Sequence, residues 1–121
     1  MARELSEAVP GAALLTVWTP MLDADDEAAA RSLPGGAAGN FYDPARLAGR
    51  AVAALLGAPE GTLAWDIYLF YRAGVQWAEP WPTPVTWVHQ LGPLSWARPE
   101  RFAWGKELPA AFRRALAEAA E

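Results

Sequence analysis

The stretch from Asp43 to Tyr71 most constrains the fold, because it carries the signals of a complete helix and of a strand after it. Asp43 can cap a helix, Pro44 suits the first helical position, and Gly57 suits the C-terminal cap. The apolar residues that fall on one helical face are Leu47, Ala51, Val52, Ala54 and Leu55. The apolar run from Leu63 to Tyr71 predicts the strand.

A second apolar run, Ala12–Thr19, is typical of a strand that is buried on both faces, as in a parallel sheet. Residues 2–8 before it indicate the end of a short helix. An Ala-rich helix is expected to follow and to end near Leu33. Its first turn holds four acids: Asp23, Asp25, Asp26 and Glu27. They are the ligand type of a hard metal, but they lack the Gly and the distal Glu of a calcium loop, so we expect capping of the helix and no metal.

After the strand at 63–71, the turn Arg72–Gly74 predicts a tight hairpin, because Gly74 can adopt a positive φ. Residues 75–77 are then expected to return antiparallel to that strand. Three prolines exclude residues 79–84 from a regular ladder. Residues 85–91 form either a short strand or an ordered loop.

The last part of the chain, residues 92–108, is aromatic-rich and irregular in pattern. Pro109 is expected to open a final helix with Phe112 and Leu116 on one face. Strands that alternate with helices, with an antiparallel edge added by a hairpin, indicate an α/β fold. A length of 121 residues fits one domain.

The segment YDPARLAGRAVAALLGAPEGTLAWDIYLFYRAGVQW resembles the redoxin arrangement of Asp, helix, short loop, apolar strand, turn, Gly and return strand. With VWTPMLDADDEAAA and TWVHQL, it is similar to a group of uncharacterised bacterial thioredoxin-like proteins over residues 10–91. The resemblance implies an incomplete thioredoxin-like sheet, mixed parallel and antiparallel, with flanking helices and an irregular Trp/Pro-rich segment.

The same resemblance implies a single domain over residues 1–121 that lacks the first strand and most of the first helix. The Cys-x-x-Cys motif of thioredoxin-like enzymes belongs to that missing part, and Ala64 and Trp65 stand where a cis-proline is usual. Without the first strand, residues 12–19 and 63–71 each present an unpaired edge. Three explanations remain open: a reading frame that starts too late, a dimer that fills the gap, or a different strand topology.

Composition excludes several function classes. The chain has no cysteine, which rules out disulfides, thiolate zinc sites and a cysteine nucleophile. A formal charge of -4 argues against binding to nucleic acid. No apolar run approaches the roughly 20 residues that span a bilayer, and the N-terminus lacks an apolar signal core. We expect a soluble, cytoplasmic protein without a cofactor.

Asp66 and His89 are the candidate catalytic residues. Asp66 lies inside the predicted strand, where a buried carboxylate could act as a base or tune a thiol. The alternative is a carboxylate that accepts hydrogen bonds, or that pairs with an arginine or with His89 at the rim of the sheet. His89 could complete two thirds of a catalytic triad, but no nucleophile is evident, and a lone histidine in an apolar run is more often structural.

Trp77, Trp81 and Trp87 are the candidate ligand-binding residues, within a segment rich in tryptophan and proline. They predict either an aromatic groove for a peptide, a sugar or a protein partner, or large rings that fill the core below an irregular segment.

Three functional hypotheses follow. The first is a thioredoxin-like protein without redox cysteines, which serves binding or interaction or is an N-terminally truncated member of a thiol–disulfide family. The second is a small enzyme that uses Asp66 and His89 in a Trp-lined cleft. The third is a structural homodimer through open sheet edges.

Overall fold

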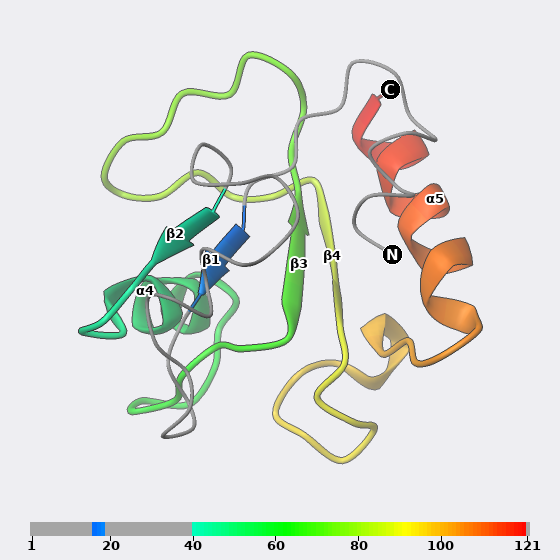
Figure 1. Cartoon of the computed structure of the whole chain (residues 1–121), viewed down its shortest axis with the longest axis horizontal. Helices are drawn as coiled ribbons and strands as arrows, with labels where there is room; N and C mark the ends of the chain where they lie inside the picture. The colour runs from blue at the N-terminus through cyan, green and yellow to red at the C-terminus, as the bar shows by residue number, and fades with distance from the viewer. Residues whose placement is uncertain (1–15, 19–39, 121) are drawn as a thin grey trace.

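Helix α5 (Glu107–Ala120) organises the fold by packing against the strands β3 (Ile67–Phe70) and β4 (Thr86–His89). The computed structural model describes residues 16–18 and 40–120. Figure 1 shows α5 on one side of this strand pair. On the other side lie α4 (Leu47–Leu55), β1 (Thr16–Trp18) and β2 (Asn40–Tyr42). The predicted mixture of helices and strands, a general α/β content, is confirmed.

The core lies between α5 and the two strands. Tyr68 and Phe70 share one face of β3, as strand alternation predicts, and both rings contact Phe112 edge-on at centroid distances of 4.5 and 5.6 Å. Leu116 is partly buried against the same cluster, so the inward face predicted for this helix is confirmed. The buried remainder of the cluster is mostly alanine, which lets the helix approach the strands closely: Val88, Ala103, Leu108, Ala111, Ala115 and Ala119.

Asp43 caps α4 as predicted, although the helix begins later than expected. The Asp43 carboxylate accepts hydrogen bonds from the backbone N–H groups of Leu47 at 2.9 Å and Ala48 at 2.8 Å. Pro44 is not the first helical residue, because Arg46 adopts a left-handed conformation (φ 59) and delays the start of α4 to Leu47. The carboxylate therefore satisfies N–H groups that have no partner inside the helix.

Gly57 ends α4 as predicted. It has a φ of 80, and its N–H donates to the carbonyl of Ala54 while that of Ala58 donates to the carbonyl of Ala53. This pair of bonds is a Schellman motif, in which glycine takes the left-handed position without steric cost.

The buried face of α4 differs from the predicted one. Gly49 and Ala53 are buried, whereas Leu47 is 65% exposed. The segment before β3 explains the difference, because the N–H of Ala64 donates to the carbonyl of Gly49 at 2.9 Å. This close approach selects the helix face that has the smallest side chains.

The strand pairing corrects the predicted hairpin. β3 pairs antiparallel with β4, and Ile67 is opposite His89, so the return strand is Thr86–His89 and not residues 75–77. Gly74 does take a positive φ of 84, as expected. The chain after it is held by aromatic contacts such as Tyr71–Trp77 at 5.0 Å and not by a ladder. Residues 79–84 form no strand, as their prolines predict.

β1 and β2 form a separate parallel pair in which Val17 is opposite Phe41. β2 was not expected from the sequence. Val17 is 49% exposed, so the prediction of a strand buried on both faces is wrong at this residue. The described strands form two pairs and not one incomplete sheet.

Several sequence predictions concern residues outside 16–18 and 40–120. These are the helices at 2–8 and near 23–33 and the acidic group Asp23, Asp25, Asp26 and Glu27. Among the helices that are described, none is long and apolar enough to cross a bilayer.

Candidate functional site

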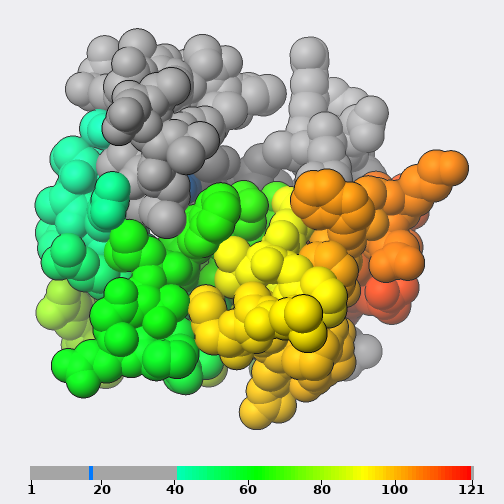
Figure 2. Space-filling view, turned by 90° about the horizontal axis from the view of Figure 1, so that it is seen from below, coloured from blue at the N-terminus to red at the C-terminus, as the bar shows by residue number. Residues whose placement is uncertain are grey.

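The open edge of β4 is where the site is built. The N–H of Gln90 donates to the carbonyl of Asp66 at 3.0 Å. Antiparallel alternation therefore turns the backbone of Trp87 and His89 away from β3. The chain then covers this edge itself: the N–H of Ala103 donates to the carbonyl of His89 at 3.1 Å. Seen from below in Figure 2, the segment after β4 (yellow) lies between the segment before β3 (green) and α5 (orange).

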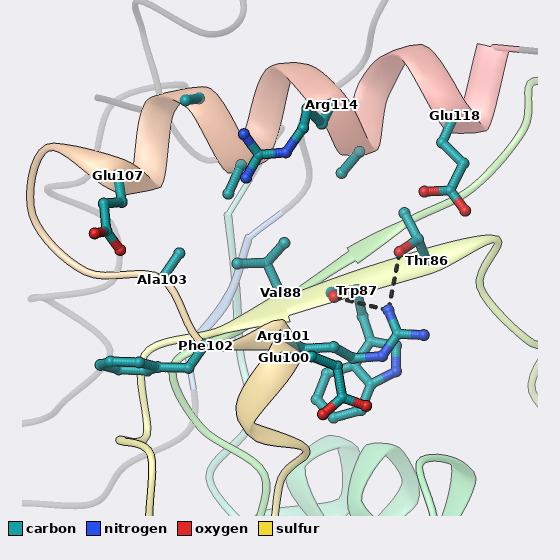
Figure 3. A pocket seen from close by; sticks show the side chains of 13 residues that line it. Thr86, Trp87, Val88, Glu100, Arg101, Phe102, Ala103, Glu107, Arg114 and Glu118 are labelled. Carbon is teal, nitrogen blue, oxygen red and sulfur yellow. Dashed lines mark hydrogen bonds between the residues drawn. The ribbon is translucent and has the colours of Figure 1, made fainter.

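A cleft of about 430 Å³ lies between this covered edge and α5 (Figure 3). Its volume is within the range of about 300–1,000 Å³ that is usual for ligand sites. Its apolar lining includes Val88, Ala103, Ala111 and Ala115. These four residues also belong to the hydrophobic core, so the cleft borders the core.

Five charged side chains line the cleft: Glu100, Arg101, Glu107, Arg114 and Glu118. Across residues 16–18 and 40–120, the one ion pair is that of Arg98 with Glu100, at 3.7 Å on the surface. The guanidinium of Arg114 and the carboxylates of Glu107 and Glu118 thus line the cleft without forming an ion pair there.

Arg101 belongs to the short 3-10 helix η1 (Pro99–Arg101) and is fixed against β4. Its Nη1 donates to Thr86 Oγ1 at 2.9 Å and to the carbonyl of Trp87 at 3.1 Å. Its Cζ lies 5.1 Å from the centroid of the Trp87 ring, within cation–π range. The side chain replaces a neighbouring strand at the open edge, since it satisfies the carbonyl that a strand would bond.

His89 is fully buried (0% exposed), and both of its ring nitrogens are engaged. Nδ1 accepts a hydrogen bond from the N–H of Leu91 at 3.2 Å, so Nε2 carries the proton and donates to the carbonyl of Arg98 at 2.8 Å. No ring nitrogen remains for a substrate or for Asp66. His89 connects β4 to the loop that carries η1, which is a structural role.

Asp66 lies just before β3 and not within it, with a left-handed φ of 53. Its side chain is exposed, which corrects the expectation of a buried carboxylate. Within the described part of the chain its carboxylate has no hydrogen bond or ion pair, so the alternative of a partnered carboxylate finds no support among these residues. Partial desolvation raises the pKa of Asp66 above its ordinary value of 3.8. The structure does not assemble Asp66 and His89 into a catalytic pair.

The raised pKa predicts that Asp66→Asn stabilises the protein slightly at neutral pH. An acid whose pKa is raised by folding destabilises the folded state once it is ionised. Asparagine removes that charge and tolerates a left-handed φ. We expect a gain of less than about 0.5 kcal/mol at pH 7, as is usual for an exposed site, and no gain near pH 3.

Urea denaturation at the two pH values measures this gain, with Glu79→Gln as the control for loss of an exposed charge elsewhere. A loss of stability at pH 7, or an equal gain at both pH values, would contradict a raised pKa of Asp66 in the folded protein.

The three candidate tryptophans fall into two groups. Trp77 is 53% exposed and contacts Tyr71 and Trp81, at 5.0 and 5.6 Å between ring centroids. Trp87 is 9% exposed, stacks on Trp96 at 6.1 Å and lies below Arg101. Trp87 therefore fits the alternative in which large rings fill the core. Trp77 does not, because half of its surface is exposed to solvent.

The residues that sequence reasoning missed are Arg101, Arg114 and Glu118. Helical spacing does contain a signal for two of them, because Arg114 and Glu118 are four residues apart and share a face with Glu107 and Ala111. The element opposite that face was not predictable. No group of three or more His, Cys, Asp or Glu residues that could hold a metal occurs among the described residues.

The chain matches no protein-family model, no curated protein and no solved structure.

Proposed function

We propose that this chain is a non-catalytic binding module whose ligand or partner occupies the cleft between β4 and α5. The observation that carries the proposal is the cleft itself: its volume suits a ligand, and Arg114, Glu107 and Glu118 in its lining form no ion pair with another described residue. His89, the residue most suited to acid–base chemistry, is fully buried and does not line the cleft. A site with these properties suits the recognition of a ligand.

A thioredoxin-like relationship is part of the same proposal. The order α4, β3, β4, α5, with β3 and β4 antiparallel, supports it, because this order corresponds to the second half of that fold. The separate pairing of β1 with β2 counts against a single sheet. The proposal also places the protein in the cytoplasm, which fractionation of the source cells tests.

Backbone-amide NMR with three aromatic fragments tests the binding module. Benzyl alcohol is neutral, benzylamine is cationic, and phenylacetate is anionic. We expect saturable shifts at Val88, Ala103, Ala111 and Ala115 with at least one of them. Gly57 and Gly74, which lie away from the cleft, provide control resonances. If none of the three shifts the cleft residues up to millimolar concentration, the proposal fails.

A homodimer is a second candidate function, and the exposed pair Val17 and Phe41 favours it. These residues are opposite each other in a two-stranded sheet and are 49% and 50% exposed. Two-stranded sheets are marginally stable alone, and added strands or apolar cover stabilise them.

Sedimentation equilibrium at micromolar concentration tests the dimer. We expect Phe41→Ser to weaken association, whereas Leu47→Ser, a matched change at another exposed apolar residue, should not. A wild-type protein that is monomeric throughout this range would rule the dimer out.

A further inference from the structure

We propose that the aromatic cluster of Tyr71, Trp77 and Trp81 binds a proline-rich segment of a partner protein in the polyproline II conformation. The cluster lies in the connection between β3 and β4. Figure 1 shows this connection extending away from α5, toward the side of β1 and β2. None of the three residues lines the cleft, so this surface is separate from the cleft and does not depend on a ligand there.

Ring contacts bring the three side chains together. The ring centroid of Trp77 lies 5.0 Å from that of Tyr71 and 5.6 Å from that of Trp81. The ring plane of Trp77 is inclined by 60° to the plane of Tyr71 and by 86° to the plane of Trp81. Rings at these angles cannot form one flat plate, so the surface that they build is ridged.

The cluster does more than pack a loop onto the core. Trp77 is 53% exposed, and none of the three residues belongs to the hydrophobic core that the described residues form. Aromatic side chains that contact one another and remain open to solvent are typical of an interaction surface, because their apolar area is buried only when a partner binds.

The cluster is ordered before a partner arrives. Tyr71 Oη donates to the carbonyl of Pro82 at 2.9 Å, which ties the end of β3 to the segment that carries Trp81. Pro80 and Pro82 flank Trp81, and the ring of each proline fixes its own φ. A surface that is ordered in advance loses little conformational entropy on binding.

The hydrogen-bonding capacity of Trp77 selects the kind of ligand. Its indole N–H has no acceptor within residues 16–18 and 40–120, and an indole can only donate. A polyproline II segment has backbone carbonyls without internal hydrogen bonds, and its prolines have no N–H. It therefore accepts a bond from the indole and needs no acceptor in return. A β-strand or a sugar also brings donors, for which an indole offers no acceptor.

NMR titration of the whole chain with three probes tests the ligand class. The probes are capped decaproline, a capped Gly-Ser peptide of the same length and cellohexaose. We expect saturable shifts of the indole N–H resonances of Trp77 and Trp81 with decaproline. The Gly-Ser peptide offers as many carbonyls but is a flexible coil, so it should bind more weakly. No shift with decaproline up to millimolar concentration, equal binding of the Gly-Ser peptide, or tighter binding of cellohexaose would overturn the proposal.

Substitutions of Trp77 test the surface itself, with binding followed at the Trp81 indole. Trp77→Ala should weaken decaproline binding about tenfold or more. Trp104→Ala is the matched control, because Trp104 is also exposed (63%) but lies outside the cluster. Equal effects of these two changes would overturn the proposal.

Trp77→Phe separates the indole N–H from the ring. Phenylalanine keeps an aromatic ring at this exposed position but cannot donate, so we expect decaproline to bind about fivefold more weakly. A Trp77→Phe protein that binds decaproline as tightly as the wild type would overturn the role of the indole N–H and, with it, the choice of ligand.

Discussion

Replacing His89 by alanine should lower the free energy of unfolding by about 4 kcal/mol. The side chain is fully buried, and its loss leaves the N–H of Leu91 and the carbonyl of Arg98 without their partner. Each of these two partly buried hydrogen bonds contributes about 1 kcal/mol, and the cavity adds to this cost. The ring also packs beside Trp87 and Phe102, each at 5.8 Å between centroids. Urea denaturation measures the difference.

His89→Phe separates the polar contribution from the packing contribution. Phenylalanine keeps a ring in the cavity but cannot make either hydrogen bond, so we expect a loss of about 2 kcal/mol. Gln76→Ala, a change at an exposed position, should stay within about 0.5 kcal/mol. A His89→Phe protein as stable as the wild type would show that the two hydrogen bonds contribute nothing, and that the structural role assigned to His89 is wrong.

Local sequence signals predicted those features whose hydrogen bonds join residues that are close in the sequence. The Asp43 cap and the Gly57 termination of α4 are examples, since both form between groups at most six positions apart. The inward face of α5 at Phe112 was also predictable, because helical spacing alone places the apolar side chains on one stripe.

Long-range pairing was not predictable from the same signals. The turn at Gly74 does occur, but a turn does not decide which segment pairs with β3. β3 pairs with Thr86–His89 and not with residues 75–77. All four residues of Thr86–His89 are buried in this pairing, whereas Trp77 is half exposed. The prediction that Asp66 lies inside a strand was wrong for a related reason. β3 begins at Ile67, the residue after Asp66, because the pairing with β4 begins there.

The site was the least predictable part of the molecule. Arginine is common in this sequence, and nothing local distinguishes Arg101 from the other eight arginines. Its role depends on where η1 lies beside β4, which follows from the His89 bond to Arg98 and from the cover of the open edge by Ala103. The same bonds that occupy His89 thus place Arg101 at the cleft.

Replacing Phe112 by alanine should lower the free energy of unfolding by about 3–5 kcal/mol. Phe112 is 5% exposed and is the ring through which α5 contacts both Tyr68 and Phe70. Edge-to-face aromatic pairs add about 0.5–1.5 kcal/mol beyond the area that they bury. Phe41→Ala is the matched control, because it removes the same atoms from a residue that is 50% exposed. Its cost should be much smaller.

Phe112 also connects stability to the proposed binding site, because α5 is one wall of the cleft. Phe112→Leu should cost less stability than the alanine variant and leave the protein folded, but with α5 less firmly positioned. The affinity for a fragment that binds the cleft should then fall although Phe112 does not line the cleft. An unchanged affinity in a measurably destabilised Phe112→Leu protein would show that the wall is held by other contacts. A Phe112→Ala cost no greater than that of Phe41→Ala would show that the packing of α5 on β3 is not a main source of stability.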